Sequence, residues 1–140
     1  MAQTAVFAGC YASLAEISAF ISKAARQAGL DSQNIYAAQL AVDEACTNII
    51  NHAYGGEDRG EITCSVNPAP GQLTIILEDN GHPFKPGKIR GPNRRAPLSR
   101  RKQGGLGLFF IYSTMDEVRY ETSAGHGNRL TLVKRQNPAH

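Results

Sequence analysis

The sequence lacks any apolar run long enough to cross a membrane. A spanning helix needs about 20 consecutive apolar residues, and no stretch of this chain approaches that length. The first residues, 1–20, have no basic start followed by an apolar block, so the sequence predicts no secretory signal. From these absences we expect a cytoplasmic protein with no membrane partner.

Cysteine and histidine are also sparse. The three cysteines (Cys10, Cys46 and Cys64) are odd in number and lack metal-like spacing, and the four histidines are scattered. The sequence therefore offers neither a disulfide framework nor a metal cluster. Cys46 and Cys64 fall on predicted core positions, where we expect them to act as small buried apolar residues.

Acidic residues are absent from one long segment, residues 82–103, which holds eight of the 15 basic residues. The rest of the chain has seven basic and 12 acidic residues, a formal charge of −5. Prolines and glycines interrupt the segment, and it shows no periodicity. A connection of this length in a small domain is typically functional, and its charge predicts that anions gather there.

What is present fits one folded domain. A chain of 140 residues with 41% apolar content can bury one real core and is too short for two comfortable ones. The composition argues against disorder. We therefore predict a single domain over residues 1–140.

Hydrophobic periodicity predicts an α+β fold. Ser13 and Glu16 have the spacing of a capping box at the start of a helix, Gly29 is suited to end that helix, and Asp31 or Ser32 can cap the next. Strands in adjacent hairpins, with the helices between them, favour a mostly antiparallel sheet with helices packed on one face. The expected strands are 4–9, 61–67, 73–79, 117–122 and 129–134, and the expected helices are 13–29, 31–54 and 107–115.

The second predicted helix carries two polar residues four positions apart, Glu44 and Asn48. Residues at this spacing lie on one helix face, and both should point roughly opposite the apolar stripe. A Glu can accept a proton, and an Asn carbonyl oxygen can bind Mg2+. Solvated Glu and Asn are also ordinary on an exposed helix, so this pair needs support. The stripe consists of Ile35, Ala38, Val42, Cys46, Ile49 and Ala53.

Two further motifs supply that support. Asp79 ends a predicted core-facing strand and is followed by Asn80 and Gly81, so it can accept a hydrogen bond from the amine of adenine beside a residue without a side chain. A glycine cluster at residues 104–108 opens a helix, where backbone amides favour phosphate. Taken alone, the Asp79-Asn80-Gly81 motif can be an ordinary turn, and the glycine cluster can be a plain loop. Together with the pair Glu44 and Asn48, in this order along the chain, they describe an ATP site.

The order of these motifs resembles that of the GHKL-type ATPases, which include histidine kinases and gyrase-type topoisomerases. Within that superfamily the sequence is most similar to the anti-sigma-factor serine-protein kinases of bacterial partner switching. The matching segments are 41–48, 52–54, 78–84, 104–108 and 127–130, and the resemblance covers nearly the whole chain.

The resemblance implies a two-layer Bergerat-type sandwich in which residues 82–103 form a lid over ATP. It implies that Asn48 binds Mg2+, that Asp79 binds the adenine amine with Gly81 beside the ring, and that Glu44 is the general base for a protein serine. Pro83 and Lys85 depart from common residues of the family and put the geometry of the lid in question. The implied phosphate-binding residues are Gly104, Gly105, Leu106, Gly107 and Leu108.

The resemblance also implies partners: a sigma factor, an anti-sigma antagonist that is phosphorylated on serine, and a second copy of the chain in a homodimer. An alternative is a non-catalytic ATP-binding switch that regulates a phosphatase or other signalling protein. Nucleic-acid binding through the basic segment is a third hypothesis. We expect no direct binding of nucleic acid, because the segment has one aromatic residue, Phe84, and the rest of the chain is acidic.

Overall fold

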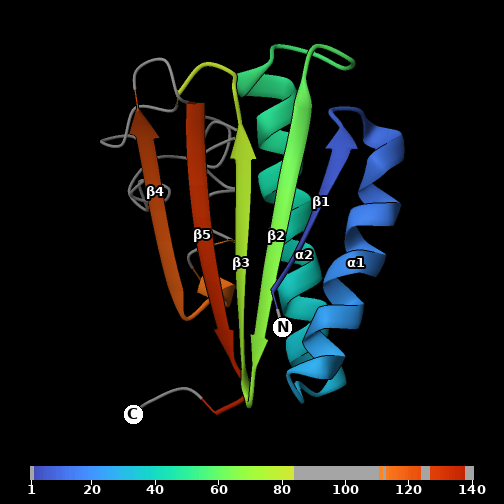
Figure 1. The fold of residues 1–140 in the computed structure, drawn as a ribbon, viewed down its shortest axis with the longest axis vertical. Helices are drawn as coiled ribbons and strands as arrows, with labels where there is room; N and C mark the ends of the chain where they lie inside the picture. The colour runs from blue at the N-terminus through green and yellow to red at the C-terminus, as the bar shows by residue number, and fades with distance from the viewer. Residues whose placement is uncertain (1, 84–110, 112, 124–126, 138–140) are drawn as a thin grey trace, which may run out of the picture.

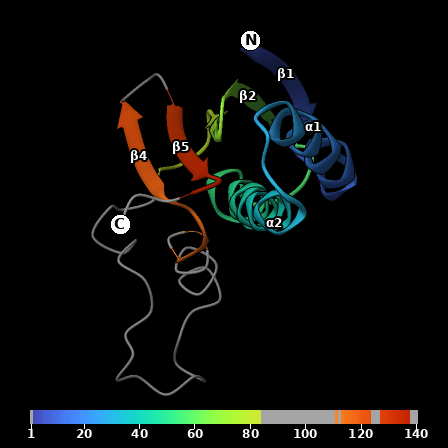
Figure 2. The ribbon, with the colours of Figure 1, turned by 90° about the horizontal axis from the view of Figure 1, so that it is seen from below.

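A five-stranded antiparallel sheet is covered on one face by two helices (Figures 1 and 2). The computed structural model describes residues 2–83, 111, 113–123 and 127–137. The strands are β1 (Gln3–Ala8), β2 (Glu61–Ala69), β3 (Gln72–Asp79), β4 (Glu117–Ser123) and β5 (Gly127–Arg135), in the spatial order β1-β2-β3-β5-β4. The main helices are α1 (Leu14–Gln27) and α2 (Ser32–Asn48). The predicted α+β class and layering are confirmed.

The remaining sequence predictions fall partly outside the described residues. The basic segment from residue 84 onward and the whole glycine cluster lie there, as does most of the helix expected at 107–115. Of that helix, four residues are described: Ile111, Ser113 and Thr114 are helical, whereas Met115 lies in a bend.

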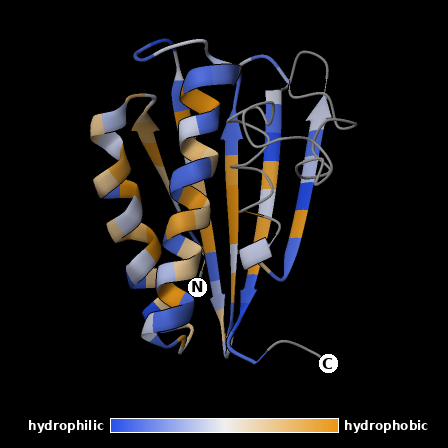
Figure 3. Cartoon of the chain, turned by 180° about the vertical axis from the view of Figure 1, so that it is seen from behind, coloured by the Kyte–Doolittle hydropathy of each residue, from blue (hydrophilic) through white to orange (hydrophobic). Residues whose placement is uncertain are grey.

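The core lies between the sheet and the two helices. Alternate residues of the central strands face the helices, so Ile62, Cys64 and Val66 of β2 are buried beside Leu73 and Ile75 of β3. The middle of β3 is strongly hydrophobic, as seen from the helical side in Figure 3. Asp79 continues this inward-facing row and is its polar end. The inward-facing apolar row of this central strand therefore ends in a carboxylate at the edge of the core.

The first helix ends as its sequence predicts and begins differently. Gly29 has φ of 82°, and the amide of Leu30 donates to the carbonyl of Ala25 at 3.0 Å, which is a Schellman C-cap. The capping box expected at Ser13 is wrong, because that side chain makes no capping bond. A 3-10 turn over Tyr11–Ser13 leads directly into α1, so Ser13 already has helical backbone angles.

The second helix is fixed at its start and altered at its end. Asp31 is the N-cap and accepts from the amide of Asn34 at 2.9 Å, as expected. After Asn48 the helix widens into a π-helical turn, η2 (Ile49–Ala53), in which the amide of Tyr54 donates to the carbonyl of Ile49. Such turns are rare and occur frequently at functional sites.

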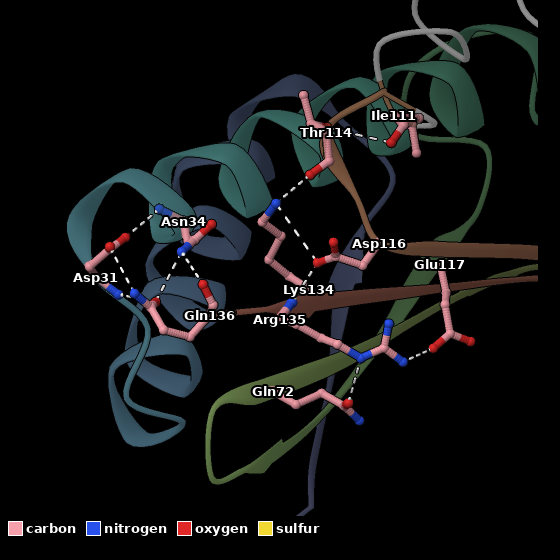
Figure 4. Close-up of polar contacts among 10 residues, drawn as sticks. All are labelled: Asp31, Asn34, Gln72, Ile111, Thr114, Asp116, Glu117, Lys134, Arg135 and Gln136. Atoms are coloured by element: carbon pink, nitrogen blue, oxygen red, sulfur yellow. Dashed lines mark hydrogen bonds and ion pairs between the residues drawn. The ribbon is translucent and has the colours of Figure 1, made fainter. Parts of the chain in front are cut away.

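The end of β5 joins three elements, as Figure 4 shows. Lys134 donates to the carbonyl of Thr114 at 2.7 Å, Arg135 pairs with Glu117 at the start of β4, and Gln136 donates to Asp31 at 2.8 Å. The side-chain oxygen of Gln136 also accepts from the backbone amide of Asp31. The contacts of Gln136 fix the start of α2, and the whole group lies at the opposite end of the sheet from Asp79, which ends β3 (Figure 1).

Candidate functional site

Glu44 and Asn48 both lie within the regular part of α2, one helical turn apart, because the π turn begins only at Ile49. Glu44 is half-buried, whereas Asn48 is 5% exposed. The prediction that both point away from the core is therefore wrong for Asn48. Ala41 and Ala45 are buried too, and they form a second inward row that includes Asn48. Because alanine is only weakly apolar, the sequence-based prediction did not include this second row, and the predicted apolar stripe was narrower than the buried face of the helix.

The side-chain nitrogen of Asn48 is buried and lacks a hydrogen-bond partner in the described part of the chain. Its Nδ2 is inaccessible to solvent and makes no hydrogen bond with any described residue. An unsatisfied buried amide costs about 1–3 kcal/mol, so Asn48 is not explained by the fold. A polar group that is buried in this way, with no partner in the residues that the structure describes, fits a side chain that binds a ligand.

Asp79 is held at the end of β3 by two donors. Its Oδ1 accepts from Nδ2 of Asn128 at 2.7 Å and from the amide of Gly81 at 2.9 Å. The carboxylate is 7% exposed. Burial raises the pKa of Asp79 above its ordinary value, and the hydrogen bonds from Asn128 and Gly81 oppose that shift.

The segment after Asp79 is fixed to the end of α2. The amide of His82 donates to the carbonyl of Ala53 at 2.7 Å, and the amide of Asn80 donates to the hydroxyl of Tyr54 at 3.0 Å. The ends of α2 and β3 also lie at the same end of the molecule in Figure 1. The structure therefore joins the end of the helix that carries Glu44 and Asn48 to the segment that follows Asp79.

Gly81 is required by this junction. A Cβ at this position would lie 2.3 Å from the carbonyl oxygen of Ala53 and 2.8 Å from its Cβ. From the sequence, we expect Gly81 to leave room for a flat adenine ring because it has no side chain. The structure adds a reason that the sequence did not suggest, which is close packing against the π turn.

Two surface hollows flank the segment. One of about 510 Å³ includes Tyr54, Arg59 and His82, and the other, of about 320 Å³, includes Thr122 and Asn128. Asn80 and Gly81 line both.

Burial raises the pKa of Tyr54, the hydrogen bond from Asn80 opposes the rise, and the nearby Asp79 charge adds to it.

Comparison with known proteins decides the family. A model described as the histidine kinase-like ATPase domain matches residues 7–134. Serine-protein kinase RsbW of Oceanobacillus iheyensis is 33% identical over 109 residues, which cover 75% of this chain and 69% of that protein. RsbW of Listeria monocytogenes strain HCC23 is 35% identical, with 78% and 71% covered. This chain belongs to the RsbW serine-protein kinases of the histidine kinase-like ATPase family.

One more relative and one solved structure are also similar to this chain. RsbW of Bacillus subtilis strain 168 is 31% identical, with 75% of this chain and 68% of that protein covered. A crystal structure of the RsbU and RsbW domains of a Mycobacterium tuberculosis protein matches with a TM-score of 0.67 at 18% identity. The match covers 96% of this chain and 32% of that longer one, and it supports the fold alone.

The described helices include none that is both long and apolar enough to span a membrane.

The family assignment implies an ATP-binding domain, and four of the predicted site residues are described: Glu44, Asn48, Asp79 and Gly81. Gly104, Gly105, Leu106, Gly107 and Leu108 lie outside the described residues. Sequence reasoning gave no role to Asn128, although it is 4% exposed and directly bonded to Asp79. Its only signal was its place beside Gly127 in a segment that matched the family.

Proposed function

We propose that this chain is a cytoplasmic anti-sigma factor that transfers the γ-phosphate of ATP to a serine of an antagonist protein. The observation that supports this proposal is the buried Nδ2 of Asn48, which has no hydrogen-bond partner among the described residues and lies one turn after the half-buried Glu44. A domain that served only as a scaffold would gain stability from an apolar residue at position 48.

Each predicted site residue has its own proposed role in nucleotide binding. Asn48 would hold Mg2+ through its side-chain oxygen, and the ion would supply charge neutralisation at the phosphates. Asp79 accepts a hydrogen bond from the exocyclic amine of adenine. Both hydrogen bonds to its carboxylate reach Oδ1, so Oδ2 is free of donors from the described residues and is available to the base. Residues 104–108 are proposed to bind the phosphates, and residues 82–103 to cover them.

Glu44 is proposed as the general base. Its carboxylate accepts the proton of the serine hydroxyl as the hydroxyl oxygen forms a bond to the γ-phosphorus. The bond between that phosphorus and the oxygen that bridges to the β-phosphate breaks, and ADP leaves with its electron pair. Its partial exposure leaves it accessible to a protein substrate. Phosphoryl transfer depends mainly on positioning and charge neutralisation, so one base and a fixed nucleotide suffice.

The partners follow from the family. We propose that this chain binds a sigma factor and an antagonist protein, and that its active form is a homodimer. The sequence-based alternative, a nucleotide-gated regulator that transfers no phosphate, requires the same ATP site and differs only in the role of Glu44.

Phosphate transfer from γ-labelled ATP to the antagonist tests the proposal. We expect transfer by the wild type and by Asp43→Asn, a control at an exposed neighbouring carboxylate. Glu44→Gln should lose at least about 100-fold in rate with unchanged ATP affinity by calorimetry. ATP binding by the wild type without any phosphate transfer would leave the non-catalytic switch as the function.

A further inference from the structure

Asn128 connects three strands at the site. It lies in β5 directly opposite Asp79 of β3 on one side and Thr122 of β4 on the other. Its side chain is almost wholly buried. The sheet therefore places a polar residue between the carboxylate of Asp79 and the edge strand, in a position where apolar residues pack further along the same row.

The amide of Asn128 has a defined orientation. Its Oδ1 accepts from the hydroxyl of Thr122 at 2.9 Å, which turns Nδ2 toward Asp79. Nδ2 lies 2.7 Å from Oδ1 of Asp79 and 3.1 Å from the carbonyl oxygen of Gly81. It also lies 3.4 Å from the carbonyl oxygen of His82. One amide thus holds both the carboxylate and the backbone that follows it.

This arrangement determines what Asp79 can offer a ligand. Oδ1 is occupied by two donors, and the carboxylate can only accept hydrogen bonds while it is ionised. A purine with an amine at its sixth position can donate to Oδ2. A purine with a carbonyl there would place two acceptors against each other. The arrangement thus fits a 6-amino purine.

We propose that Asn128, oriented by Thr122, is a positioning residue that fixes Asp79 as an acceptor and thereby makes the site select 6-amino over 6-oxo purine nucleotides. The inference rests on the proposed nucleotide site. Asn128 acts through Asp79 and has no part in the transfer of phosphate.

Calorimetric titration with ATP and with inosine triphosphate, both with Mg2+, tests this role because the two bases differ at the sixth position. A site built around a hydrogen bond to an amine rejects an analogue that lacks it by a large factor, so the wild type should prefer ATP by at least about 100-fold. Asn128→Asp removes the donor and places a second carboxylate against Asp79, which favours a shared proton. We expect its preference for ATP to fall at least about tenfold.

Thr122→Val is the second variant, because Thr122 is exposed and its loss leaves the core intact. Without the hydroxyl the amide of Asn128 can rotate, and the preference for ATP should fall by a smaller factor. Arg129→Gln, on the opposite face of β5 beside Glu78, is the matched control and should keep the wild-type preference. Thermal unfolding of each variant identifies those that fold.

The outcomes separate the two proposals. A wild type that binds neither nucleotide overturns the proposed function and this inference with it. A wild type that prefers ATP, with the same preference in folded Thr122→Val and in Asn128→Asp, overturns the inference alone. If Asn128→Asp does not fold, Thr122→Val decides.

Discussion

Gly81 packs against the carbonyl of Ala53, the last residue of the π turn, and a Cβ there would approach that oxygen to 2.3 Å. The contact joins the end of the helix that bears Asn48 to the segment that follows Asp79. Neither partner can move independently, because the amide of His82 also donates to the same carbonyl.

Gly81→Ala should therefore impair ATP binding as well as stability. The added methyl group must displace the backbone of either segment, which separates the two parts of the site. Gly29→Ala is the control: Gly29 has φ of 82° and open space around it, so its substitution should cost stability, roughly 1–2 kcal/mol, with unchanged ATP affinity. Equal ATP affinity in the two variants, measured by calorimetry, would contradict the coupling.

Asn48→Leu should separate stability from function. The buried amide has no hydrogen bond to lose among the described residues, and an apolar side chain of similar size removes its desolvation cost. The thermal midpoint of the nucleotide-free protein should stay level or rise. Mg2+-dependent ATP binding should disappear. A large drop in stability would show that Asn48 is a structural residue and would remove the main support for the site.

Asp79→Asn should alter how stability depends on pH. Burial raises the folded-state pKa of Asp79 above its ordinary value of 3.8. The folded state therefore holds the proton more tightly, and this stabilising contribution is complete below the unfolded pKa and is lost as pH rises through the folded pKa. In urea titrations of the nucleotide-free protein, the variant should gain stability relative to the wild type from about pH 4 toward neutrality. A constant difference across that range would contradict the expected shift.

The cysteines should differ in reactivity. Burial raises the pKa of the Cys64 thiol to about 12 and also raises the pKa of the Cys46 thiol, whereas Cys10 is partly exposed. A thiol reagent should thus modify one residue, Cys10, in the native protein and all three after unfolding. Cys10→Ser should abolish the native reaction. Rapid native labelling of Cys64 would mean that the sheet opens easily.

The strands and helices could be predicted because their signals are local. The alternation of Ile62, Cys64 and Val66, and the C-terminal glycine at position 29, depend on nearby residues only, and both appear in the structure. Ser13 was misassigned because the 3-10 turn before it leaves no trace in the capping pattern.

The site was harder to predict because its contacts join residues distant in sequence. Asn128 and Asp79 are 49 residues apart and meet only through strand register. The burial of Asn48 depends on a second row of alanines, and the need for Gly81 depends on Ala53. Residue types and spacing suggested the ligand, whereas the supporting contacts required three-dimensional positions.

Because of the π turn at Ile49–Ala53, the contact between the end of this helix and the segment after Asp79 depends on the number of residues in the turn. It closes through a bond from Tyr54 to Ile49, one residue longer than an α-helical bond. Deleting one residue here would let the helix resume its normal winding and would move the carbonyl of Ala53 away from the amide of His82, which donates to it. Chimeras that exchange this helix between relatives would have to transfer the turn and residues 79–82 together, as a matched pair.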